Sequence, residues 1–392
     1  MNEQLSYKSL APHVKYLRAA GLFRLSPDSP KRHIFFHTIY LRWLIAFFSV
    51  YTVQQILKIY EVRDDVNKVM DTMFLFITNT DCIYKAAVLQ KKPEKIEELL
   101  NTMKGPIFNL GVPEHRPILL ATVKKALLLV HMFNRLSLIT CFLWALHPTI
   151  MHMQGNPIEF AVWLPFDANQ DPQFYIAVVY VWIQTSWLAY SNTTMDIFIA
   201  FLLEQCRTQV SILRLDLESV VQKSKEEAAR TSSPYSEILE RRFGRILIHH
   251  NEIVNSADKI QDIFGGAVFY QFVIGGWILC CSAYRIVNTQ PASVEFVSML
   301  MYTTCIVVEI FVYCFFGNEL FYESNKLMDS AYAVDWLEIP VKQRRSLIIF
   351  MERVKRPICP TAGSMIPLSN STFVSILRSA YSCYAFLRNS EH

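Results

Sequence analysis

Histidine, cysteine and carboxylate side chains are the groups in this chain that could perform catalysis or hold a metal ion. His249, His250 and Glu252 lie close together, but their order is not the HExxH order of zinc proteases. They fall in a charged segment, which favours a solvated helix face. The nine cysteines include no pair with zinc-ligand spacing, so we interpret them as buried free thiols. Because the sequence also lacks a phosphate-binding loop and a nucleophile elbow, we predict neither an enzyme nor a protein that holds a metal ion or cofactor.

Four charged residues lie inside long apolar stretches. Asp81, Arg135, Asp196 and Glu309 each fall roughly 10–14 Å from the same edge of those stretches, at a helical rise of about 1.5 Å per residue. A charge in lipid is costly, so such residues usually face the interior of a helix bundle and pair with one another. We therefore predict an intramembrane charge cluster in which Arg135 pairs with Asp81 or Asp196. Its role is either packing or gating.

Aromatic and weakly polar residues gather in the outer halves of the same stretches. Such a mixture suits a pocket for a small apolar ligand. Aromatic residues at helical spacing are also typical of helix packing, so each of these residues has both interpretations. The residues that we predict to contact a ligand are Phe74, Ser137, Cys141, Trp144, Tyr180, Gln184, Trp187 and Tyr302.

The elements that must position these side chains are membrane-spanning helices. Apolar residues make up 52% of the 392 residues and charged residues 18%, below the roughly 25% typical of soluble domains. The apolar residues are concentrated in runs close to the ~20 residues that a helix needs to cross a bilayer. The second and seventh runs are the weakest, because charges interrupt them. The predicted spans are residues 43–58, 69–89, 126–146, 174–203, 264–284, 296–316 and 371–387.

The distribution of Lys and Arg indicates the orientation of these spans. Thirty Lys and Arg residues fall on the side of the N-terminus and five on the other side. Because cytoplasmic connections carry the excess of these residues, we predict a cytoplasmic N-terminus and an extracellular C-terminus. This orientation is the reverse of that of G-protein-coupled receptors. The expected fold is all-α, with seven transmembrane helices in a single domain over residues 1–392. A net charge of +4 is too small to indicate a nucleic-acid partner.

Residues 315–389 carry a series of short motifs in a fixed order. This stretch resembles insect odorant receptors, in which a GNE…DW segment follows the sixth helix and a PLS…TF element begins the last one. The rest of the chain is similar to that family in length, span number and orientation, and in the LPFD element at 164–167. The TY…QF motif of gustatory receptors is absent, and the fourth-to-fifth connection is shorter than that of the co-receptor Orco. The matching elements are Gly317–Asn318–Glu319, Glu323–Ser324, Asp335–Trp336, Arg356–Pro357, Thr361–Ala362–Gly363, Pro367–Leu368–Ser369, Thr372–Phe373 and Tyr381–Ser382.

The resemblance implies an odorant receptor subunit that is tuned to a ligand and is distinct from Orco. It implies a heterotetramer with Orco in the plasma membrane of olfactory neuron dendrites, in contact with lipid and permeable to cations without selectivity. A small volatile organic ligand would bind in a transmembrane pocket between helices two, three, four and six. Residues 1–36 would form a cytoplasmic N-terminal segment, 321–367 a cytoplasmic anchor, and 368–388 the pore-lining last helix.

Alignment of the last helix with the family places Phe386, Asn389 and Ser390 at the pore and its constriction. Phe386 is bulkier than the aliphatic residues usual there, which indicates dependence on Orco for conduction. Two other classes remain as alternatives. One is a G-protein-coupled or gustatory-type chemoreceptor, and the other is a membrane enzyme or transporter.

Overall fold

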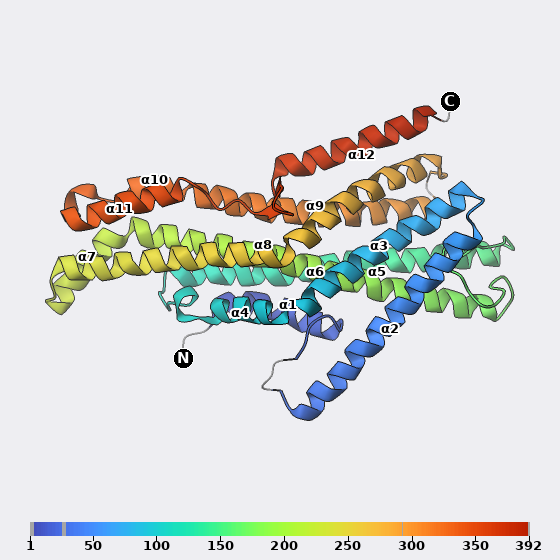
Figure 1. Cartoon of the computed structure of the whole chain (residues 1–392), viewed down its shortest axis with the longest axis horizontal. Helices are drawn as coiled ribbons and strands as arrows, with labels where there is room; N and C mark the ends of the chain where they lie inside the picture. Colours follow the sequence, from blue (N-terminus) through green and yellow to red (C-terminus); the bar gives the residue numbers. More distant parts are fainter. Residues whose placement is uncertain (1–3, 26–28, 292, 391–392) are drawn as a thin grey trace.

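Seven long helices run along the molecule in the computed structural model, which describes residues 4–25, 29–291 and 293–390 (Figure 1). Each of the seven predicted spans lies within one of these helices. Their bounds are α2 Lys31–Glu61, α3 Val66–Lys91, α5 His115–Met153, α6 Gln173–Glu218, α8 Tyr235–Asn288, α9 Val294–Asn325 and α12 Asn370–Ser390.

Shorter elements connect and cover the long helices. Two strands, β1 and β2, form an antiparallel pair, the only sheet within the described ranges. The short elements are α1 Leu5–Ala19, α4 Pro93–Lys104, η1 Pro106–Phe108, α7 Val220–Thr231, α10 Leu327–Tyr332, η2 Trp336–Glu338, α11 Val341–Val354, β1 Thr361–Ala362 and β2 Ile366–Pro367.

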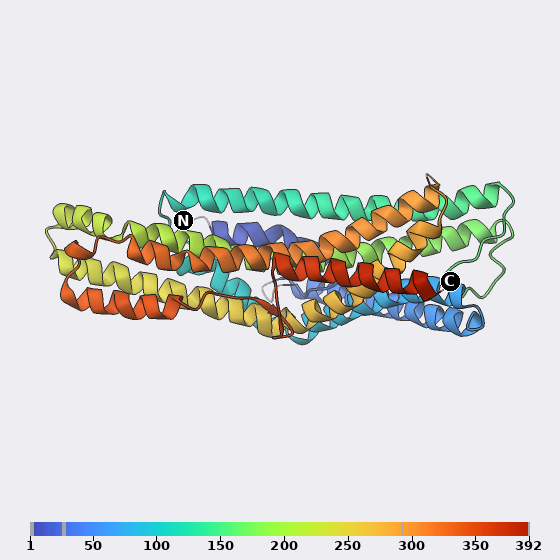
Figure 2. The ribbon, with the colours of Figure 1, turned by 90° about the horizontal axis from the view of Figure 1, so that it is seen from above.

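Two helices are far longer than a bilayer requires. At about 1.5 Å per residue, α6 and α8 are about 70 and 80 Å long, against about 30 Å of hydrocarbon. Figures 1 and 2 show that α2, α3 and α12 lie beside one half of these helices, which we call the membrane half. The other half, the distal half, holds α7, α10 and α11. Four described segments are long and apolar enough to cross a membrane by themselves: Lys31–Glu61, His115–Met153, Tyr235–Val287 and Val294–Tyr332.

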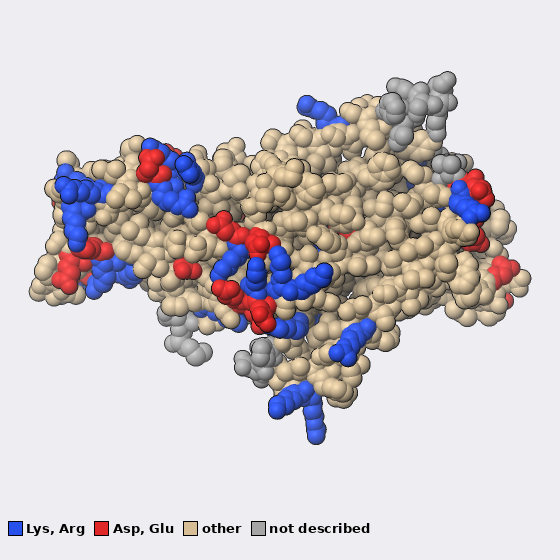
Figure 3. All heavy atoms as spheres, in the orientation of Figure 1, with Lys and Arg blue, Asp and Glu red and all other residues tan. Residues whose placement is uncertain are grey.

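Charged residues gather where the two halves meet. Lys95 and Lys259 contact Asp262 and Glu98 respectively, each at 2.7 Å, and these pairs tie α4 to α8. The cluster forms a patch near the middle of the face in Figure 3, and much of the membrane half on that face is free of charged side chains. This distribution is typical of a boundary between lipid and water.

Histidines at the distal end of α8 are buried, so the predicted solvated face is wrong for His249 and His250. His249 Nε2 lies 2.9 Å from Gln209 Oε1 on α6, and Gln209 donates in turn to Ser6 on α1. His250 packs edge-on against Phe350 of α11. Burial lowers the pKa of both histidines to about 4, so they remain neutral. Sequence alone did not show that α6 and α11 cover α8 from two sides.

The linker before α12 lies tightly against α8 and α9. The Gly363 N–H donates to the Gly265 carbonyl oxygen at 2.8 Å, which fixes the β1–β2 turn on α8. On α9, Gly317 faces Leu368, and a Cβ at Gly317 would lie 2.8 Å from the Leu368 carbonyl oxygen. Only glycine at 317 allows this approach, which explains why a GNE element on α9 accompanies a PLS element in the linker.

Replacing Gly317 with alanine is expected to lower the Tm of the detergent-purified protein, at a cost of about 1–3 kcal/mol, because α9 and the linker must move apart. Gly244→Ala is the control, since an added Cβ there meets no heavy atom within 4 Å. This control should be neutral, or stabilising by up to about 1 kcal/mol through helix propensity. Equal Tm values for the two variants would contradict the packing described for Gly317.

Candidate functional site

A cavity of about 80 Å³, here called the inner cavity, lies among α2, α3, α5, α6 and α9 in the membrane half. Its wall combines aliphatic and aromatic side chains with hydroxyl and amide groups, as expected of a site for a small, mainly apolar molecule. The lining residues are Tyr51, Gln55, Leu75, Thr78, Ser137, Thr140, Cys141, Trp144, Thr185, Leu188, Ala189, Asn192, Thr193, Tyr302, Cys305, Ile306 and Glu309.

A second cavity of about 370 Å³, the outer cavity, adjoins the first toward the loop between α5 and α6. The two cavities share four lining residues: Tyr51, Leu75, Trp144 and Thr185. Residues 157–162 of the loop line the outer cavity on its far side. The two cavities are therefore neighbours with one shared wall.

Three aromatic rings, the aromatic triad, stand between the cavities. Phe74 of α3 lines the outer cavity, Tyr302 of α9 lines the inner one, and Trp144 of α5 lines both. Ring centroids are 4.6 Å apart for Phe74 and Tyr302 and 5.4 Å apart for Trp144 and Tyr302, within the range of favourable aromatic contacts. The Tyr302 hydroxyl is 2.9 Å from that of Thr78. Movement of one ring would change the wall that the two cavities share.

The predicted ligand contacts on α3, α5 and α9 lie at the cavities, whereas those on α6 do not. Tyr180, Gln184 and Trp187 are absent from both linings. Tyr180 donates to Gln54 at 2.5 Å, and Gln184 donates to the Phe47 carbonyl oxygen at 3.3 Å. These residues lie on another face of α6, because each step along a helix turns by about 100°. The cavity face of α6 holds Thr185, Leu188, Ala189, Asn192 and Thr193. The placed contacts are Phe74, Ser137, Cys141, Trp144 and Tyr302.

Residues of α2 complete the cavity, and sequence reasoning missed them. Tyr51 and Gln55 are buried, four residues apart, in the first span. Polar residues at that spacing inside an apolar helix are a detectable signal, since they share one face and avoid lipid.

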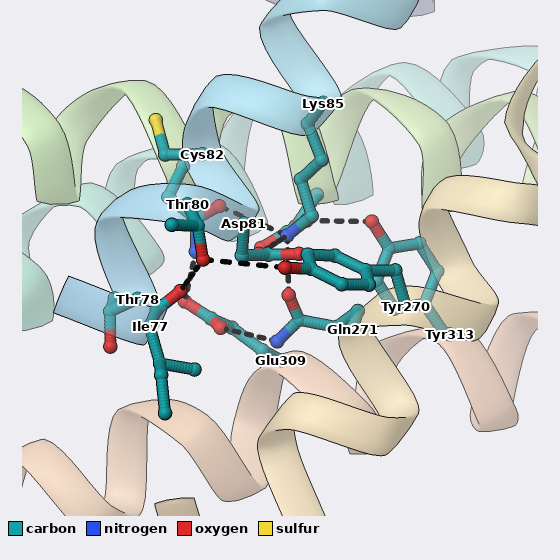
Figure 4. Close-up of polar contacts among 12 residues, drawn as sticks. Ile77, Thr78, Thr80, Asp81, Cys82, Lys85, Tyr270, Gln271, Glu309 and Tyr313 are labelled. Carbon is teal, nitrogen blue, oxygen red and sulfur yellow. Dashed lines mark hydrogen bonds and ion pairs between the residues drawn. The ribbon is translucent and has the colours of Figure 1, made fainter. Parts of the chain in front are cut away.

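A buried charge network lies beneath the inner cavity (Figure 4). The Lys85 ammonium is 2.8 Å from Asp81 Oδ2 and 2.6 Å from Asp196 Oδ1. It also donates to the side-chain oxygens of Gln271 at 2.6 Å and Asn192 at 2.9 Å. The Lys85 side chain is 1% exposed, so a cation and its acceptors are enclosed by protein.

Lys85, rather than Arg135, is the cation of this network, so the predicted pairing of Arg135 with Asp81 or Asp196 is wrong. Arg135 is exposed and forms no ion pair with any residue that the structure describes. Its neighbours Asn134 and Ser137 face the bundle, and the turn of the helix directs Arg135 outward. The four-residue spacing of Asp81 and Lys85 places both on one helix face and was the available signal.

Glu309 connects the network to the inner cavity, which it also lines. Because Lys85 donates to the carbonyl oxygens of Asn192 and Gln271, both amides must turn their NH₂ groups away from it. Those NH₂ groups donate to Glu309, at 3.2 Å from Asn192 and 3.0 Å from Gln271. The Lys85 ammonium thus fixes the orientation of two amides and, through them, of the Glu309 carboxyl group.

The predicted pore residues fall at the end of α12. Phe386, Asn389 and Ser390 belong to the helix as bounded above, but their side chains lie outside the described part of the structure. Ser379, Ala380 and Cys383, which precede them, line an apolar groove of about 760 Å³ shared with α8 and α3.

Comparison with known proteins gives one consistent family. A sequence model of the seven-transmembrane odorant receptors matches residues 65–381. Among curated relatives, odorant receptor 94a of Drosophila melanogaster is 25% identical over 61% of this chain and 60% of that protein. Odorant receptor Or1 of Anopheles gambiae is 20% identical over 88% of this chain and 87% of that protein.

Solved structures agree in fold. The olfactory receptor OR5 from Machilis hrabei in complex with eugenol has a TM-score of 0.79 with this chain at 16% identity, over 97% of each chain. A second structure of OR5 from Machilis hrabei has a TM-score of 0.78 with this chain at 15% identity, over 96% of each chain. The likeness covers the arrangement of all seven long helices.

Replacing Lys85 with methionine is expected to destabilise the helix bundle by about 3–5 kcal/mol, because Asp81 and Asp196 would lose their only buried cation. The measurements are Tm after purification and the fraction of protein at the cell surface. Arg135→Met is the matched control, and its effect should stay within about 0.5 kcal/mol. If the two variants lose stability equally, the network does not hold the helices together.

Proposed function

The chain belongs to the insect odorant receptor family, and from this premise we propose that it is a ligand-tuned subunit that binds a small volatile organic molecule. The observation that carries the proposal is the inner cavity, which lies between α2, α3, α5, α6 and α9 and shares a wall with the outer cavity. The similar OR5 has been solved in complex with eugenol, which supports a small organic molecule as the ligand.

Binding would derive its free energy mainly from burial of apolar surface, at about 25 cal/mol per Å². A ligand opens a channel only if it binds the open state more tightly than the closed one. Helix α9 is suited to couple ligand binding to the pore helix. It carries Tyr302 and Glu309 at the cavity and also contacts α12. Phe311 of α9 and Phe373 of α12 pack edge-on with centroids 5.4 Å apart.

We further propose that the subunit assembles with Orco into a heterotetrameric, non-selective cation channel in the plasma membrane. In this assembly the N-terminus is cytoplasmic, α12 lines the pore, and Phe386, Asn389 and Ser390 lie at its constriction. The family resemblance supports these assignments, and so does the position of α12 at the margin of the bundle (Figure 1). A G-protein-coupled receptor is disfavoured by both the family and the orientation.

The anchor proposed for residues 321–367 has an apolar surface that the chain itself does not cover. Leu347 and Phe350 of α11 are buried, whereas Leu337 is 88% and Ile349 71% exposed. A monomeric soluble surface rarely exposes such residues together. We propose that this side of η2 and α11 packs against Orco.

In cells that express both this chain and Orco, a panel of volatiles is expected to include compounds that evoke cation current. Cells that express either subunit alone provide the control. Trp144→Ala should shift the half-maximal concentration of an active compound by about tenfold or more, because a wall of both cavities is lost. Surface expression should stay unchanged. Equal loss of response and surface expression would instead assign Trp144 a folding role.

Ile349→Glu is expected to lower co-purification with Orco by about tenfold, because a charge would have to be buried in the proposed interface. Gln222→Glu, at an exposed polar position on α7, is the control. Normal recovery of the Orco complex with Ile349→Glu would remove this surface from the assembly.

A further inference from the structure

Two N–H donors of the inner cavity wall have no hydrogen-bond partner among the described residues. They are Nε2 of Gln55 on α2 and Nε1 of Trp144 on α5. Both residues line the inner cavity, and Gln55 is 0% exposed. A buried donor without an acceptor is costly, so such groups in native proteins usually face something that accepts a hydrogen bond.

The orientation of the Gln55 amide is fixed by its neighbours. Thr52 donates its only hydroxyl hydrogen to the Phe48 carbonyl oxygen at 2.8 Å. Thr52 must therefore accept from Asn79, which lies 2.8 Å away and must present its NH₂ group. The same NH₂ group lies 3.1 Å from Gln55, so the atom that faces it is Oε1. The NH₂ group of Gln55 is consequently the end that remains without a partner.

The oxygen atoms of the cavity wall, in contrast, already take part in hydrogen bonds and still have lone pairs that can accept more. Each oxygen of Glu309 accepts one amide N–H, from Asn192 or from Gln271. Thr140 and Thr185 donate to backbone carbonyl oxygens of their own helices, so neither offers a free hydrogen. The N–H groups of Gln55 and Trp144 are therefore the wall groups that most need a partner, because a buried donor without any acceptor costs more than an oxygen with one vacant lone pair.

We infer that the inner cavity selects a ligand that carries a carbonyl oxygen (a ketone, aldehyde or ester) and that Gln55 donates the hydrogen bond that recognises it. The inference rests on the proposed ligand-binding function and deepens it. A carbonyl oxygen has two lone pairs and brings no donor of its own, so it matches donors on two walls. An alcohol can accept the same hydrogen bond, but its own O–H then also needs an acceptor at a matching position on the wall. A hydrocarbon of the same shape leaves the Gln55 donor unpaired.

The test compares three compounds with one carbon skeleton: a ketone, its secondary alcohol, and the alkene in which C=CH₂ replaces C=O. Dose–response curves are recorded in cells that co-express Orco. The half-maximal concentration is expected to be lowest for the ketone and at least about tenfold higher for the alkene. Gln55→Met, which keeps length but removes the donor, should raise the ketone value toward that of the alkene while leaving the alkene response nearly unchanged.

Two further variants separate recognition from folding. Asn79→Leu removes the amide that orients Gln55, so Gln55 can turn either its oxygen or its NH₂ group toward the ligand, and the preference for the ketone should fall in part. Trp144→Phe keeps an aromatic ring without the N–H and should reduce the preference in part. The unchanged alkene response and surface labelling report that each variant is folded.

Equal sensitivity of the unmodified receptor to ketone and alkene would overturn the inference, and so would a ketone preference that survives Gln55→Met. In both cases the channel still opens to volatiles, so the proposed function would stand. A receptor that responds to none of a broad volatile panel, despite surface expression with Orco, would overturn the proposed function and this inference together.

Discussion

Lys85 carries a positive charge into the membrane half of the bundle, and that charge must be matched by protein groups because lipid supplies none. Asp81 on the same helix and Asp196 on α6 match it directly. Gln271 of α8 and Glu309 of α9 complete the network. Since α3, α6, α8 and α9 each contribute a side chain, the requirement restricts how each helix is rotated and how deep it sits.

The same restriction shapes the ligand cavity. Asn192 and Glu309 belong to the network and also line the inner cavity, so the cavity floor is held by hydrogen bonds that begin at an ammonium group. A floor fixed in this way is pre-organised and loses little side-chain freedom when a ligand binds. The other walls, formed by α2 and the aromatic triad, contain no charged group of this network and leave the donors of Gln55 and Trp144 without a partner in the described part of the chain.

The predictions made from sequence succeeded where the relevant information is local. Runs of apolar residues located all seven long helices, because the hydrophobic requirement of a span is met residue by residue. Ser137, Cys141 and Trp144 of α5 line the inner cavity, and their contact with a ligand stays a prediction. The residues predicted on α6 line neither cavity, because aromatic residues occur on several faces of that helix and composition does not tell which face turns inward. The predicted pairing of Arg135 was wrong for a similar reason, because the sequence did not show which face of α5 turns toward the bundle.

The sequence by itself determined the number and positions of the long helices. Through motifs in the last third of the chain, it also indicated the family. Tertiary structure alone decided which of several equivalent helix faces meet. That choice depends on groups far apart in the chain, such as Lys85 with Asp196 or Gln55 with Asn79, whose pairing is favourable only after the helices have come together. Hydrophobicity acts on each segment separately. Hydrogen bonds and ion pairs between helices depend on how the helices are rotated relative to one another, and this rotation cannot be predicted from a single segment.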